Sequence, residues 1–127
     1  MTTPAMLRRR YRTDAVSTAS PARLVVMLYD RLATDLHTAS AAVGVADIEG
    51  AHVALLHAQE IVAELSGSLD LEVWPQGEGL AALYDFLRDR LVRANVTKDA
   101  AFIAECIEVV EPLREAFSEA ALVPDTA

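Results

Sequence analysis

Thr18-Ala-Ser-Pro-Ala-Arg-Leu-Val-Val-Met-Leu-Tyr-Asp30 is the stretch of this chain that decides its fold. Ser20 can accept a hydrogen bond from a free backbone N–H in the first turn of a helix, and Pro21 suits the first helical position. Six consecutive apolar residues, 24–29, follow. A helix that packs on one side needs only an apolar stripe, so this helix is either buried all round or carries apolar surface for a partner.

Apolar residues recur at three- and four-residue spacing along the rest of the chain, which predicts helices. We expect four of them, over residues 20–43, 47–69, 76–94 and 97–119, with the start of the fourth between Thr97 and Asp99. The third begins at Gln76 or Glu78, and Gly44 and Asn95 are the expected terminators of the first and third. No stretch of the sequence alternates between apolar and polar residues in the way that a β-strand would. The pattern predicts an all-α, antiparallel up-down-up-down four-helix bundle.

Length and composition agree with a single helical domain. The 127 residues are 53% hydrophobic but only 6% aromatic, which predicts a core of aliphatic side chains. We divide the chain into a basic N-terminal arm that caps the bundle (1–19), the bundle itself (20–120) and a disordered tail (121–127). Because Cys106 is the single cysteine, the chain cannot form an intramolecular disulfide. We expect Cys106 to be a small residue of the core.

The charge is unevenly distributed. Residues 1–23 hold five of the 11 basic residues and one of the 19 acidic residues, so the arm is basic and the bundle acidic. An acidic bundle does not suit a nucleic-acid binder, whose affinity comes from neutralising phosphates. No apolar run is long enough to insert into a membrane, and no signal-peptide pattern follows Arg8-Arg9-Arg10. We therefore expect a cytosolic protein.

The order of several short motifs is similar to that of the flagellar secretion chaperone family, FliS. The resemblance covers roughly Tyr11 to Phe117. Its motifs, in chain order, are Thr18 to Asp30, Ala58-Gln59-Glu60-Ile61-Val62-x-Glu64-Leu65, Ser68-Leu69-Asp70, Leu80-x-x-Leu83-Tyr84-Asp85-Phe86-Leu87, Leu91-x-x-Ala94-Asn95 and Leu113-Arg114-x-x-Phe117.

Four features depart from the family pattern. Arg31 stands where many members have glycine, so a close approach there is lost or replaced by a charge contact, and Phe117 stands where tryptophan is common. The stretch Leu71 to Gly77 does not map to the usual loop, and its Trp74 is either a local anchor or a client contact. Pro112 is the largest departure.

The resemblance implies a non-enzymatic export chaperone that binds the disordered C-terminal region of flagellin in apolar grooves. Such a chaperone prevents premature polymerisation and delivers flagellin to the flagellar type III export gate. No cofactor is implied, and the free protein would be a monomer or a weak homodimer. The alternative is a helical adaptor or regulator that binds another amphipathic helix in the same way.

The resemblance also implies partner-binding positions. In this family the N-terminal segment covers part of the groove until the client displaces it, which makes Tyr11 and Val16 the lid residues here. A plain disordered basic arm is the other interpretation. At the level of sequence, a core position and a groove position are equally open for each groove candidate. These candidates are Leu24, Met27, Leu28, Leu83, Leu87 and Leu91.

Enzymatic interpretations find little support. Glu49-x-x-His52 has the spacing of a di-iron ligand pair, but no second such pair exists, so we expect no metal. We expect the histidines at the surface or at helix ends and the carboxylates of residues 105, 108, 111 and 115 on a solvated face. Tyr29 and Tyr84 are expected to bury their rings and keep their hydroxyls in water.

Two further residues break or extend the helical pattern. Pro112 lies inside the fourth helix, where it either bends the helix or ends its packed part. Gln59 is expected to satisfy buried backbone or a neighbouring helix, with client contact as the second interpretation.

Overall fold

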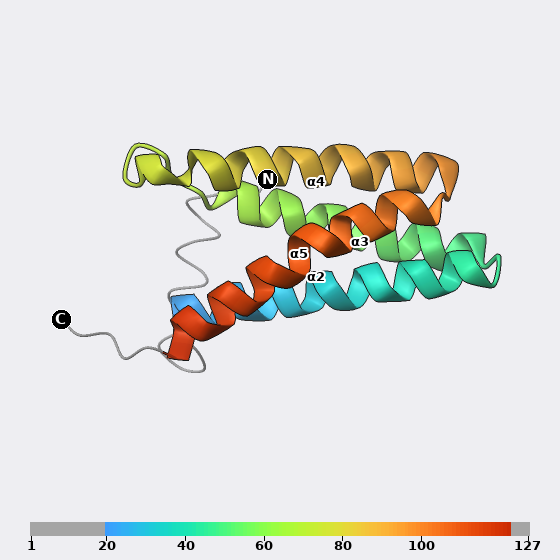
Figure 1. Ribbon diagram of the computed structural model, residues 1–127, viewed down its shortest axis with the longest axis horizontal. Coiled ribbons are helices and arrows are strands. Elements are labelled where there is room, and N and C mark those ends of the chain that lie inside the picture. Colours follow the sequence, from blue (N-terminus) through green and yellow to red (C-terminus); the bar gives the residue numbers. More distant parts are fainter. Residues whose placement is uncertain (1–19, 123–127) are drawn as a thin grey trace, which may run out of the picture.

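The computed structural model describes residues 20–122 and has four long helices joined by short connections (Figure 1). The described residues contain no strand, which confirms the all-α bundle. The elements are α2 (Pro21–Gly44), α3 (Ile48–Gly67), the short 3-10 helix η1 (Pro75–Gly77), α4 (Glu78–Thr97) and α5 (Ala100–Leu122).

Successive helices run antiparallel, and each packs against two neighbours. α2 contacts α3 and α5, and α4 contacts the same two helices from the other side. Figure 1 shows α5 crossing the bundle obliquely, from beside α4 at its start to the beginning of α2 at its end.

Capping bonds confirm the predicted starts of the first two helices, whereas the fourth begins at Ala100, just after the expected range. Ser20 Oγ accepts a hydrogen bond from the backbone N–H of Arg23 at 3.1 Å. Asp47 caps α3 by accepting from the N–H of Gly50 at 2.9 Å. A Cβ at position 50 would lie 2.3 Å from Asp47 Oδ2, so glycine is what allows this close approach in the first turn.

The helix ends differ from the expected ones. α4 continues past Asn95 to Thr97, and Lys98 adopts the left-handed conformation that Asn95 was expected to supply. The Lys98 ammonium donates to Asn95 Oδ1 at 2.7 Å, which helps to hold this left-handed turn. α2 does end at Gly44, but the left-handed residue after it is Ala46. α5 extends beyond position 119 to Leu122, so two residues assigned to the tail are helical.

The core is built from aliphatic side chains of all four helices, and Cys106 lies within it as expected. Tyr29 and Tyr84 are also buried, but their hydroxyls are not in water. The two hydroxyl oxygens are 2.6 Å apart and share a hydrogen bond inside the bundle. The prediction of solvated hydroxyls was therefore wrong, because each phenol found its polar partner in the other.

α5 is continuous through Pro112, so the packed helix does not end there. Beyond the proline, Phe117 stacks on Tyr29 with ring centroids 5.0 Å apart and planes 18° from parallel. Arg114 Nη1 lies 3.4 Å from Asp30 Oδ1 on α2. These contacts hold the final turns of α5 over the first half of α2.

Candidate functional site

The apolar run at the start of α2 divides into a core side and an outer side. Val26 and Tyr29 are buried, whereas Leu24 and Leu28 are half-buried. Met27 has 51% of its surface exposed. Leu28 packs against the core with part of its surface open, whereas Met27 is mostly exposed, so the first half of α2 carries apolar surface outside the core.

The three leucines proposed on α4 fall into two groups. Leu87 and Leu91 are fully buried in the core, together with Tyr84. Leu83 is exposed. At about 100° per residue, Leu83 lies about 40° from Leu87 and about 100° from Tyr84 around the helix, so it falls at the edge of the inward face. Only Leu83 of these three is therefore available to a partner in this conformation.

A surface groove of about 310 Å³ runs between α3 and α4. Leu56 and Val92 are its large apolar side chains, and both are exposed. Gln59, half-buried, lines the same groove rather than lying in the core. The lining is completed by Glu60, Ala63 and Arg88.

The sequence reasoning did not identify Leu56 and Val92 as surface residues. A signal was present in the pairs Leu55-Leu56 and Leu91-Val92. Two adjacent residues on a helix point about 100° apart, so one member of such a pair often lies at the edge of the inward stripe. The structure buries Leu55 and Leu91 and leaves their neighbours on the surface.

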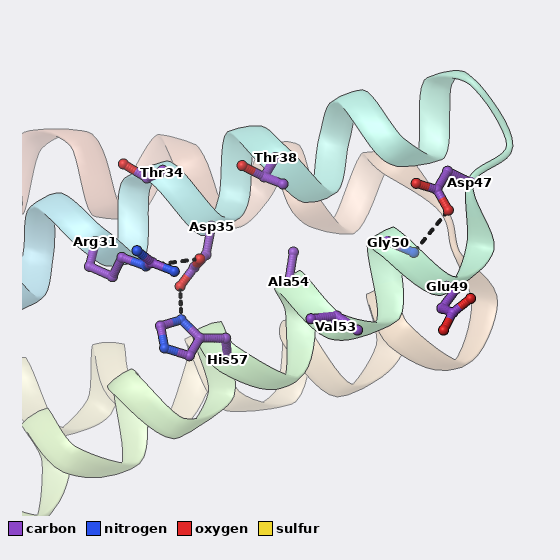
Figure 2. A pocket seen from close by; sticks show the side chains of 10 residues that line it. All are labelled: Arg31, Thr34, Asp35, Thr38, Asp47, Glu49, Gly50, Val53, Ala54 and His57. Atoms are coloured by element: carbon purple, nitrogen blue, oxygen red, sulfur yellow. Dashed lines mark hydrogen bonds and ion pairs between the residues drawn. The ribbon is translucent and has the colours of Figure 1, made fainter.

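A larger cleft, of about 580 Å³, lies between α2 and α3 (Figure 2). Asp35 is a buried acidic residue on its wall. One carboxylate oxygen of Asp35 contacts Nδ1 of His57 on α3, and the other lies 3.4 Å from Nε of Arg31. Arg31 therefore makes a charge contact at the position where many family members have glycine. The Asp35–His57 contact links α2 to α3 and was not anticipated from sequence.

The remaining histidines are at the surface, as expected, but they have partners. His37 Nε2 lies 3.1 Å from Glu111 Oε1, and His52 Nδ1 lies 3.0 Å from Asn95 Oδ1. The hydrogen bond from His37, reinforced by Arg114, lowers the pKa of the Glu111 carboxyl. Glu105 pairs with Arg90 at 2.5 Å, so the carboxylates of α5 are not all simply solvated.

Two candidate reactive features have ordinary structural roles. Burial is the main factor that raises the pKa of Cys106, to about 12, so its thiol stays protonated at neutral pH. His52 is bonded to Asn95, while Glu49 lines the α2–α3 cleft. Within residues 20–122 no three His, Cys, Asp or Glu side chains are grouped so that they could hold a metal ion.

Comparison with known proteins agrees with this geometry. The family model described as flagellar protein FliS matches residues 4–124. The chain belongs to the FliS family. A flagellar secretion chaperone FliS from Bacillus subtilis (strain 168) is 32% identical over 110 residues, covering 87% of this chain and 82% of the relative. One from Escherichia coli (strain K12) is 32% identical over 113 residues, covering 87% and 83%.

The FliS match includes the arm that carries the proposed lid residues. Tyr11 and Val16 both lie outside the described residues, so their placement stays a prediction. Among the helices that the structure describes, none is long and apolar enough to cross a bilayer. The FliS relatives are named as chaperones, a role that depends on binding rather than on catalysis.

Proposed function

We propose that this FliS-family protein is a cytoplasmic export chaperone for flagellin. It binds the disordered C-terminal region of flagellin, keeps it from polymerising and delivers it to the flagellar type III export gate. The observation that carries the proposal is apolar surface on a bundle whose core is already complete. Relatives named flagellar secretion chaperones support the same role.

The candidate side chains that are exposed or half-buried define the proposed surface for the client. Leu24, Met27 and Leu28 on α2, and Leu83 on α4, offer apolar contact to an amphipathic segment. Helical or extended stretches of the client that lie along α2 and along α4 would bury their apolar faces there without polymerising. Leu87 and Leu91 support α4 from within the core and act on binding only through its position.

The arm completes the proposal as a lid. Its arginines have opposite charge to the acidic bundle, and Tyr11 and Val16 supply apolar contact. We expect the lid to cover client surface until flagellin displaces it. Hydrogen exchange tests this directly: amides of residues 7–16 should be protected in the free protein and lose protection when flagellin binds. Full exchange without client would remove the lid from the mechanism.

Calorimetric titration with the C-terminal segment of flagellin from the same organism is the first test. We expect saturable 1:1 binding with a clearly negative heat-capacity change, because apolar surface is buried. A folded, helical protein that does not bind this segment would contradict the proposal and favour a helical adaptor with another partner.

A matched pair of variants tests where the client binds. Met27→Ser should weaken flagellin binding while leaving the melting temperature nearly unchanged, because the side chain is largely exposed. Val45→Ser is the control, since Val45 is exposed at the opposite end of α2. Equal affinities for the two variants would remove the start of α2 from the binding surface.

A further inference from the structure

The connection between α3 and α4 contains an ordered turn, residues 70–77, that we call the Trp74 turn. Asp70 organises it: Oδ1 accepts hydrogen bonds from the backbone N–H of Glu72 at 3.1 Å and of Val73 at 3.4 Å. The carbonyl oxygen of Asp70 accepts from the N–H of Trp74 at 2.9 Å. The helix η1 then leads into α4. The backbone of this turn is therefore shaped before any partner arrives.

The Trp74 turn presents apolar side chains to solvent. Val73 is 81% exposed and Trp74 is 47% exposed, and Leu71 is also exposed. The indole ring lies over Gly77: a Cβ at that position would be 2.8 Å from Trp74 Cε3 and 3.2 Å from Leu71 Cδ2. Glycine at position 77 therefore allows the ring to pack against the turn, while about half of its surface stays open.

The charges around this apolar surface are all negative along the chain. Asp70, Glu72 and Glu78 lie in or next to the turn. The excess of acidic residues extends well beyond the turn along the sequence. Residues 32–87 contain nine acidic residues and no lysine or arginine. An anionic membrane or a nucleic acid would be repelled from such a surface.

We propose that the Trp74 turn is a docking surface for a cationic amphipathic segment of a partner protein. Aliphatic side chains of that segment would pack on Val73 and Leu71, and its lysines or arginines would lie near the carboxylates and over the open face of the indole. A cation over a tryptophan ring is the most favourable cation–π pairing, and tryptophan is enriched among residues that dominate binding energy. None of the residues in the Trp74 turn is among those proposed to bind flagellin on α2 and at Leu83.

Trp74 is the single tryptophan of the chain, so its fluorescence reports on this surface directly. The probe is a synthetic amphipathic peptide of leucine and lysine, titrated into the full-length protein. We expect a saturable blue shift of the emission, and an affinity that falls as salt is added because the attraction is between exposed charges. A matched peptide of leucine and glutamate should bind at least about tenfold more weakly, and equal binding of the two peptides would overturn the proposal.

Variants locate the binding by calorimetry. Trp74→Ala should weaken the leucine–lysine peptide by at least about tenfold, as expected for an aromatic anchor. Val73→Ser should also weaken it, whereas Val45→Ser should not, although the two valines are 81% and 78% exposed. Unchanged affinity in both Trp74→Ala and Val73→Ser would overturn the proposal.

The basic arm of the same chain is the competing occupant, and a full-length variant tests it. With Arg8, Arg9 and Arg10 all replaced by alanine, the Trp74 emission of the free protein should stay unchanged if the surface serves a partner. A red shift in that variant, with tighter binding of the leucine–lysine peptide, would assign the Trp74 turn to the arm and overturn the proposal.

Discussion

The two halves of α5, on either side of Pro112, have similar apolar spacing but different burial. In the first half, Ile103, Cys106 and Val110 are completely buried. In the second half, residues 113–122, Leu113 and Phe117 are only half-buried and no residue is fully buried. Proline contributes to the difference because it lacks an N–H and crowds the carbonyl one turn earlier, which weakens the helix at the junction.

The neighbours of the two halves explain the rest. The first half is tied to α4 through Arg90 and Glu105. The second half leans on α2 through the Tyr29–Phe117 stack and the Arg114–Asp30 contact. The comparison teaches that apolar spacing selects the inward side of a helix, while the number of packed neighbours decides how much of that side is buried.

The largest expected effect contrasts an aliphatic residue from each half. Ile103→Ala should lower the free energy of unfolding by about 2–5 kcal/mol, because it leaves a cavity in a fully packed site. Leu113→Ala should cost roughly half as much, since its side chain keeps contact with water. Urea denaturation followed by circular dichroism measures both. Equal losses would show that the two halves are packed alike.

A smaller effect is expected from Phe117→Ala, which removes the ring stacked on Tyr29. We expect a loss of about 1–3 kcal/mol, below the range for a buried phenylalanine, because Phe117 is only half-buried. Phe117→Leu is the matched control that keeps apolar volume and removes only the aromatic pairing. If Phe117→Leu destabilises as much as Phe117→Ala, stacking geometry matters more than burial at this end of α5.

Pro112→Ala tests the junction itself. The substitution restores a backbone donor inside α5, and we expect stabilisation of about 1 kcal/mol, less than the full helical penalty of proline because the unfolded chain gains freedom. Native-state hydrogen exchange should show slower exchange of residues 113–122 and little change in residues 103–110. Faster exchange beyond position 112 would mean that the second half needs the proline to fit over α2.

The smallest effect concerns Glu111, whose pairing with His37 ties the junction to α2. Its pKa in the folded state is lowered from the ordinary value of 4.5, chiefly by the His37 hydrogen bond and then by Arg114. The stabilisation it provides is therefore present above pH 4.5 and is lost as the pH falls through the lowered pKa.

Unfolding experiments at different pH values measure this contribution. The difference in unfolding free energy between the wild type and Glu111→Gln should shrink as the pH falls from about 5 to about 3. Glu108→Gln is the control, because Glu108 is exposed one turn earlier on α5. The same pH dependence in both variants would assign the effect to net charge rather than to the pairing.

The candidate site was only partly predictable, as the leucines on α4 illustrate. The motif placed Leu83, Leu87 and Leu91 together, but the structure leaves only Leu83 exposed. The Asp35–His57 contact joins residues 22 positions apart on two helices, so residue spacing within one helix cannot predict it. Leu56 and Val92 became groove residues because their neighbours in the chain took the inward positions.

The sequence by itself determined the four helices, the starts of the first two, the bundle class and the family. These properties depend on the local periodicity of apolar residues, on capping side chains and on the order of the motifs, all of which can be identified from the residue order alone. Only the tertiary structure decided which apolar side chains stay on the surface, which partners the polar groups find, and how Pro112 divides α5. Those outcomes depend on the rotation and crossing of each helix against its neighbours, and a side chain within the apolar stripe is buried only where another helix covers it.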